Sequence, residues 1–326
     1  MLCGLVVALT LAMAARAEDG TLLRYKWVEG QQMAWVWSSD QAGKTTVTDA
    51  GVAKIQDRKN HTTRTVYLRV EKVTPEGLAY LKLSYGVMAS DNEDADGTKS
   101  HYEINPVDGT TVSDEGGKRT TSKRPVSAGE LYLKGFMAVV DDRGQVQEVL
   151  GNDDLAKLVA GRPDAAKVLK RVATSALDMA PVLPEKAVKP GDEWEVDMEA
   201  LESGMMSYAP GSKPIMARYR YEGEEQVGGV NCRRISMRVE GAAVDLVGEP
   251  KLNDGLASEV RLVQLRASGD GYLSIDDGLL WLSKWTSGVS VRAHVHGTQK
   301  TGDAEQKVDV SVTTENQTNM GEMKRL

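Results

Sequence analysis

The stretch VYLRVEKVTPEGLAYLKL, residues 66–83, is typical of a β-hairpin. Apolar and polar side chains alternate in both of its arms, which is the period of a strand with one buried face. Pro75, Glu76 and Gly77 lie between the arms, and Pro and Gly there favour a tight turn. The stretch therefore predicts two antiparallel strands, 66–73 and 77–83.

The same alternation continues through most of the chain. It appears in 23–27 and 33–37, on either side of a turn at Glu29–Gly30. Further strands are expected at 131–140, 216–221, 230–239, 260–267, 279–285 and 289–296. Turn signals such as Asp108–Gly109 and Asp277–Gly278 separate such segments. We therefore expect a mainly β (α+β) protein built from curved antiparallel sheets.

One segment departs from this pattern. Asn152 is a good helix N-cap, and Val168, Leu169 and Val172 follow on one stripe at helical spacing. We expect a helical insert near 152–180 that packs this stripe against a sheet. The chain then divides into a signal peptide at 1–17, a β-rich half at 18–150, the helical insert at 151–182 and a second β-rich half at 183–326. Strand-turn-strand patterns recur in both halves, so a duplicated half-barrel and a chance similarity both stay open.

The first residues read as an export signal. An apolar run from Leu5 to Met13 precedes Ala15-Arg16-Ala17, a small-x-small cleavage site. No Lys or Arg precedes the run, so either the amino terminus supplies that charge or the true start lies upstream. Cleavage near Ala17 would send the protein to the periplasm or the extracellular space. No later stretch approaches the ~20 apolar residues of a membrane helix, so we expect no integral membrane span.

Composition narrows the function classes. Lys and Arg number 40 against 47 Asp and Glu, a formal net charge of -7, so the chain shows no electrostatic footprint for nucleic acid. Cys232 would be the one cysteine left after cleavage, and it lies in a strand-like run, 230–235. A thiol buried as a small apolar group is expected there, because no base is indicated beside it.

The segment LPEKAVKPGDEW, residues 183–194, follows a signal peptide and an acidic β-rich half. With these features the chain resembles a family of uncharacterised secreted bacterial β-rich proteins and lipoproteins. In its layout it is also loosely similar to the curved-sheet, half-barrel proteins that carry lipoproteins or lipids across the periplasm. The resemblance implies an envelope location and a concave sheet, and it transfers no catalytic residue.

An acidic loop gives the best candidate for a cation site. Asn92, Asp94, Asp96 and Glu103 occupy positions 1, 3, 5 and 12 of a calcium-loop pattern, and Gly97 occupies position 6. The flanks read as strands rather than helices, and Asn replaces Asp at the first position. A calcium site and a solvated acidic hairpin loop are therefore both open, and no other cofactor is expected.

Tryptophan supplies most of the large aromatic surface, because the chain has one Phe and six Trp. Trp27, Trp35 and Trp37 share one face of the first predicted hairpin. They either fill a core as cross-strand pairs or line an apolar groove together with Leu169 and Val172 of the helical insert.

Three functions remain. The first is a non-enzymatic envelope or extracellular binding protein that holds a lipid or another apolar small molecule in a groove between sheet and helix. The second is a structural or interaction protein whose partner is an envelope protein; it predicts a filled core and a contact surface on the sheet. The third is a hydrolase of unrecognised type. The sequence lacks the Gly-x-Ser-x-Gly, dinucleotide and phosphate-loop motifs, so we do not favour an enzyme.

Overall fold

Antiparallel strands make up nearly all of the computed structural model, which describes residues 20–49, 52–123, 135–150, 153, 157, 169, 180–197, 206–208, 215–248, 256–301 and 304–326. The strands are β1 (Gln32–Asp49), β2 (Val52–Val73), β3 (Ala79–Asp94), β4 (Lys99–Ile104), β5 (Thr110–Glu115), β6 (Lys118–Lys123), β7 (Phe136–Val140), β8 (Val146–Leu150), β9 (Glu193–Asp197), β10 (Met206–Tyr208), β11 (Met216–Val227), β12 (Val230–Gly248), β13 (Leu256–Ser274), β14 (Leu280–Thr301) and β15 (Ala304–Arg325).

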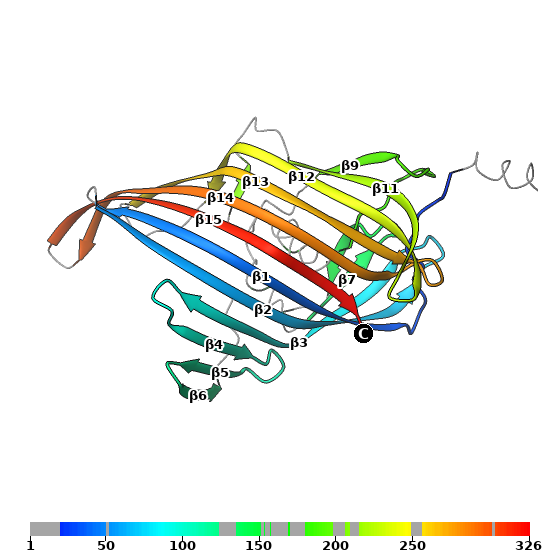
Figure 1. Cartoon of the computed structure of the whole chain (residues 1–326), viewed down its shortest axis with the longest axis horizontal. Helices are drawn as coiled ribbons and strands as arrows, with labels where there is room; N and C mark the ends of the chain where they lie inside the picture. Colours follow the sequence, from blue (N-terminus) through cyan, green and yellow to red (C-terminus); the bar gives the residue numbers. More distant parts are fainter. Residues whose placement is uncertain are drawn as a thin grey trace, which may run out of the picture.

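These strands form one large curved sheet in the order β6-β5-β4-β3-β2-β1-β15-β14-β13-β12-β11-β9 (Figure 1). The predicted hairpin at 66–83 is confirmed by the pairing of β2 with β3. Pairing of β1 with β15 joins the two β-rich halves, so both belong to the same sheet. The described strands leave the sheet open between its edge strands, β6 and β9.

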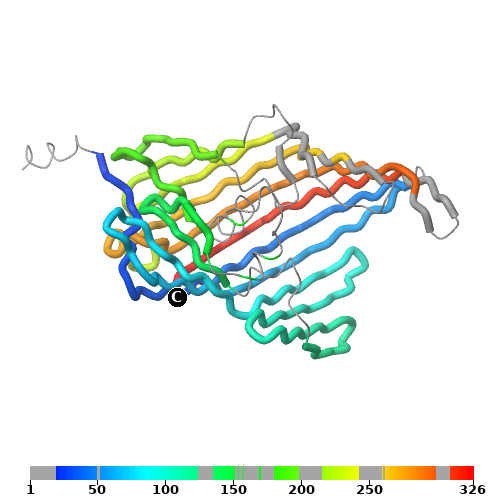
Figure 2. The backbone as a smooth tube through the Cα atoms, turned by 180° about the vertical axis from the view of Figure 1, so that it is seen from behind, coloured from blue at the N-terminus to red at the C-terminus, as the bar shows by residue number. Residues whose placement is uncertain are grey.

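The outer side of β3 is shared by two hairpins. Ala79–Leu83 pairs with β7, and Met88–Glu93 pairs with β4. The partner of β3 changes from β7 to β4 after a shift in the register of β3 against β2, which lies between Tyr85 and Met88. The β7–β8 hairpin lies behind the long strands in Figure 1 and before them in Figure 2. Its buried side chains are Phe136, Ala138, Val139, Val140 and Val146.

The two faces of the sheet differ in character. Trp35, Val66 and Tyr85 are register partners on neighbouring strands and are buried, so their side of the sheet is the core face. Residues offset by one, such as Val36, are exposed on the opposite side, which we call the polar face. This alternation is the pattern that the sequence predicts, and in β2 it is clearest over residues 66–70, near the turn to β3.

An extended N-terminal strap, residues 20–28, closes one end of the core. The Thr21 amide donates to the Val188 carbonyl at 2.7 Å, and the Tyr25 amide donates to Asp142 at 2.8 Å. Leu23 is fully buried, and the Tyr25 hydroxyl donates to the Pro181 carbonyl at 2.7 Å. Burial raises the pKa of Tyr25 well above its ordinary value, so the hydroxyl stays protonated and keeps this bond.

Three expectations change or stay untested. The strands predicted at 279–285 and 289–296 are parts of the single strand β14. The expected helical insert at 152–180 lies almost entirely outside the described residues. Asp153, Lys157 and Leu169 are described there in helical conformation, but no helix is defined among the described residues, so the insert is not supported. The expected signal peptide at 1–17 also lies outside them.

Cys232 is confirmed as a buried thiol, and burial raises its pKa.

No helix among the described residues has the length and hydropathy of a membrane span.

The strap predicts a sharp contrast between two neighbouring leucines. Leu23→Ala should lower the free energy of unfolding by about 2–5 kcal/mol, because it opens a cavity in the core. Leu22→Ala should change it by less than about 0.5 kcal/mol, since Leu22 is 54% exposed and Leu23 is 0% exposed. Urea denaturation of the two variants checks this, and equal losses would show that the strap is not part of the core.

Candidate functional site

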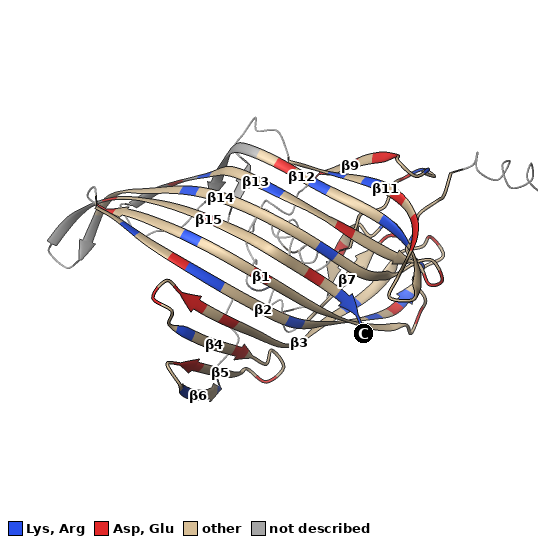
Figure 3. Cartoon of the chain, in the orientation of Figure 1, with Lys and Arg blue, Asp and Glu red and all other residues tan. Residues whose placement is uncertain are grey.

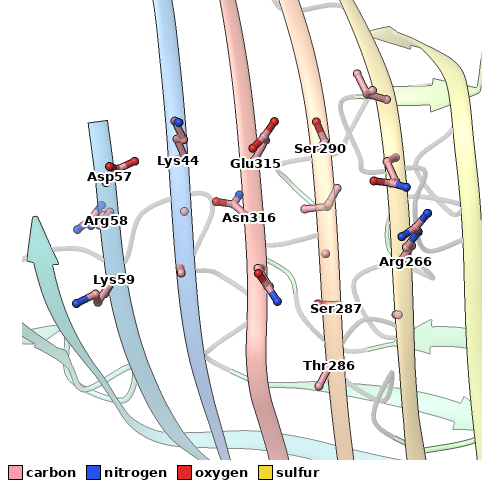
Figure 4. A pocket seen from close by; sticks show the side chains of 18 of the residues that line it. Lys44, Asp57, Arg58, Lys59, Arg266, Thr286, Ser287, Ser290, Glu315 and Asn316 are labelled. Atoms are coloured by element: carbon pink, nitrogen blue, oxygen red, sulfur yellow. The ribbon is translucent and has the colours of Figure 1, made fainter. Parts of the chain in front are cut away.

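The largest described hollow has a volume of about 1310 Å³ and is lined by side chains of β1, β2 and β12–β15 together with the β3–β4 turn. Most of these side chains belong to the polar face. Figure 4 shows Lys44, Lys59, Arg266, Ser290 and Glu315 projecting from adjacent strands into it. The hollow is therefore a broad surface feature of the sheet rather than a cavity in its core.

Strand register explains how residues so far apart in sequence meet. Arg266 lies opposite Gly288, Gly288 opposite Gln317, and Gln317 opposite Ala42. Ala42 in turn lies opposite Lys59. Residues directly opposite one another project on the same face, so this row crosses the floor of the hollow.

Register irregularities cluster beside this floor. They lie between Asp40 and Gln41 on β1, between Trp285 and Ser287 on β14, and after Leu262 on β13. Bulges increase the local twist of a sheet and bend its strands. We attribute the hollowing of the polar face to these neighbouring bulges.

The hollow carries charge of both signs, as do the long strands as a whole (Figure 3). Lys59 pairs with Glu93 at 3.2 Å, whereas Lys44, Arg238 and Glu315 form no ion pair with any described residue. Exposed charges without partners keep their full capacity for new ion pairs and hydrogen bonds. The surface is therefore suited to a polar partner of mixed charge.

A second hollow of about 770 Å³ adjoins the first and shares Lys59 and Glu93 with it. Acidic and histidine side chains alternate along it in one row across neighbouring strands. Asp40 of β1 lies opposite His61 of β2, His61 opposite Asp91 of β3, Asp91 opposite His101 of β4, and His101 opposite Asp114 of β5. We call this row the Asp-His ladder.

Hydrogen bonds connect the ladder. His61 Nδ1 lies 2.6 Å from Asp40 Oδ1, and His101 Nδ1 lies 2.6 Å from Asp91 Oδ1. The other nitrogen of His101, Nε2, lies 2.9 Å from Glu103 Oε1. A ring that donates from both nitrogens is an imidazolium, and the bonds to Asp91 and then Glu103 raise the pKa of His101.

The proposed calcium ligands are not brought together. Asn92 and Asp94 lie on the core face, because Asn92 pairs with Asn60 and Asp94 with Arg58. Glu103 lies opposite Ala89, on the polar face, and bonds to His101. The side chain of Asp96 accepts from the Thr98 amide at 2.8 Å within the turn, which also lowers its pKa. Side chains on opposite faces of a sheet cannot coordinate the same cation.

Within the described ranges, no three His, Cys, Asp or Glu side chains are grouped so as to hold a metal ion.

The tryptophans of the expected apolar groove mainly belong to the core. Trp35 is 6% exposed, and its indole donates to the Leu280 carbonyl at 3.1 Å. Trp27 stacks on Tyr25 at 5.1 Å and donates to Asp141. Trp37 packs beside Trp285. Val172 and most of the expected helical insert lie outside the described residues, so the groove between sheet and helix has no support here.

Sequence reasoning missed the Asp-His ladder and the large hollow. His61 and His101 stand alone in the sequence, 40 residues apart, and only the register of β2, β3 and β4 aligns them. A usable signal exists in the polar stretches of β2 and β3, which are rich in charged residues and Thr, but their partners depend on hairpin register.

Comparisons with known proteins place the chain in no family. No family model and no curated protein matches it. Solved structures similar to it include a DUF1329 family protein from Desulfovibrio piger, with 11% identity over 89% of this chain and 85% of that chain and a TM-score of 0.14. The COG4313 outer membrane channel from Pseudomonas putida has 7% identity over 93% and 97% of the chains and a TM-score of 0.20. Pseudomonas aeruginosa OpdQ has 7% identity over 89% and 98% and a TM-score of 0.16. Sequence identities and TM-scores this low assign neither a fold nor a function to this chain.

The doubly bonded His101 predicts a pH-dependent contribution to stability. Its pKa is raised in the folded state, so its stabilisation is present below the unfolded value of about 6.5 and is lost as pH rises through the folded value. His101→Gln should therefore destabilise the protein by about 0.3–1 kcal/mol near pH 6 and by less near pH 9. Urea denaturation at both pH values measures this difference.

The matched control is His294→Gln. His294 has a single carboxylate bond, from Nε2 to Asp309 at 2.9 Å, on strands outside the ladder. This variant controls for the loss of an imidazole ring from the surface of the sheet at each pH. An equal effect of His101→Gln at both pH values would contradict the imidazolium assignment.

Proposed function

We propose that this chain is a non-enzymatic binding protein of the cell envelope or extracellular space that contacts a partner protein through its polar face. The observation that carries the proposal is the 1310 Å³ hollow lined by charged and hydrogen-bonding side chains from neighbouring strands. It combines the filled core and the sheet-face contact surface that an interaction protein requires. The expected export signal supports an extracytoplasmic location.

An enclosed apolar site is less well supported. The three largest hollows among the described residues are lined mainly by charged, amide and hydroxyl side chains. Trp27 and Trp35, which an apolar groove would need, are packed against the core. A carrier that shields a lipid from water needs a concave apolar lining.

A protein partner suits the hollow better than a sugar. No aromatic ring lines it among the described residues, and sugar-binding surfaces stack their ligands on such rings. Arg238, Arg266 and Lys44 stand beside Glu240 and Glu315, so both signs of charge are offered within one surface. Complementary charge of this kind gives a protein interface its specificity and orientation.

Gly288 provides a direct test. A Cβ added at this floor position would meet no atom within 4 Å, so Gly288→Trp should place its ring in the hollow without a backbone clash. Retention of the partner from an envelope extract should weaken at least about tenfold, because the bulky ring blocks the contact surface. Quantitative pull-down with wild-type and variant protein, followed by mass spectrometry, measures the loss.

Thr313→Trp is the matched control. Thr313 lies opposite Thr46 and Arg292 on the same face, outside the lining of the hollow. The partner should be retained by the wild type and by Thr313→Trp, and lost by Gly288→Trp. If every interacting protein is retained equally by both variants, the hollow is not the contact surface.

A further inference from the structure

The core face changes character at one layer of side chains. Trp37 of β1, Arg64 of β2 and Met88 of β3 are register partners in this layer. Toward the strap the core face is apolar and buried. In the other direction it becomes polar, with Thr62 donating to Asn60 at 2.5 Å. A cation therefore stands at the boundary between an apolar and a polar region.

Aromatic rings hold this cation. The guanidinium carbon of Arg64 lies 4.6 Å from the ring centroid of Trp37 and 5.7 Å from that of Tyr85. Arg64 is half-buried and forms no ion pair with any described residue. By contrast, Arg58 on the same face of β2 lies 3.9 Å from Asp94. Arginines withdrawn from water are normally paired with an anion, so Arg64 retains the capacity for one.

Two buried donors at this layer also lack acceptors. The Nε of Arg64 and the indole Nε1 of Trp37 are both buried, and neither donates a hydrogen bond to a described residue. They belong to directly opposed residues on β2 and β1, so they form one patch. Buried N–H groups nearly always have an acceptor, and an anionic oxygen would satisfy both the donors and the charge.

An apolar strip begins beside the same patch. The Trp285 ring lies over Gly321 and 6.1 Å from the Trp37 ring. Ser287 follows Trp285 on the core face of β14, and beyond it Val289 and Val291 are half-buried against the core. Their exposed parts offer an open surface on which an alkyl chain can lie.

We propose that Arg64 and Trp37 bind the anionic head of a single-chain amphiphile, such as the carboxylate of a fatty acid. The head accepts hydrogen bonds from the guanidinium and the indole. The chain lies along Trp285, Val289 and Val291. The site is on the core face, whereas most side chains of the protein-binding hollow belong to the polar face; Val289 lines both.

Dodecanoate binding tests the site, with intrinsic tryptophan fluorescence and calorimetry as readouts. Arg64→Met keeps the apolar stem of the side chain but removes the charge, and should weaken dodecanoate binding at least about tenfold. Trp37→Phe keeps an aromatic ring, although a smaller one, and removes the indole donor, so it should weaken dodecanoate binding by a smaller factor. Thermal unfolding and circular dichroism of each variant confirm that it is folded.

Arg58→Met is the matched control, because Arg58 is a cation on the same strand and face and is already paired. It should bind dodecanoate like the wild type. Dodecanol, which has the chain without the charge, should bind weakly and equally to wild type and Arg64→Met, and acetate should bind more weakly than dodecanoate. The proposal is overturned if wild type does not bind dodecanoate, if Arg64→Met binds it unchanged, or if acetate binds as tightly.

Discussion

The N-terminal strap is the contact on which the packing of the core depends. It runs across one end of the sheet and bonds to segments that are distant in sequence, at 141–142, 181–188 and 275–276. Leu23 and Tyr25 fill the space between these segments, and the hydrogen bonds satisfy backbone groups that would otherwise be buried alone. Without the strap, the backbone carbonyls of Asp142, Pro181 and Val188 would lose these donors.

The sheet separates two kinds of surface by a single-residue alternation. On the core face, apolar side chains bury one end of the long strands, and a layer at Trp37 and Arg64 marks where this core ends. On the polar face, neighbouring bulges hollow the sheet and expose rows of charged side chains. A slip of one residue in the register would exchange the two faces, so the same pairing that builds the core also assembles both proposed sites.

Residue patterns predict part of this arrangement well. The hairpin at 66–83 carries strict alternation and a Pro-Glu-Gly turn, so its strands and its buried face follow from local chemistry. The far half of β2 and residues 313–319 of β15 are polar on both faces, and no alternation of apolar and polar residues predicts a strand there. Their strand structure comes from pairing with neighbours, which overrides weak local preference.

The candidate sites show the same division. The acidic loop at 92–103 has the spacing of a calcium site, yet spacing along a chain does not say which side of a sheet each residue faces. The residues of the Asp-His ladder follow no sequence motif, because each of them comes from a different strand. Both outcomes depend on hairpin register, which is set by turn lengths and bulges rather than by the ligand-like residues themselves.

Pairing of β1 with β15 also shapes how the chain can fold. Trp35 lies opposite Arg325, so the middle of the sheet joins segments nearly the whole chain apart. Such contacts form slowly, because a long loop must close before they stabilise anything. A chain that emerges amino terminus first holds the free side of β1 open until its last strand arrives. During that interval β1 is an unprotected sheet edge, and a holding chaperone would have its strongest effect there.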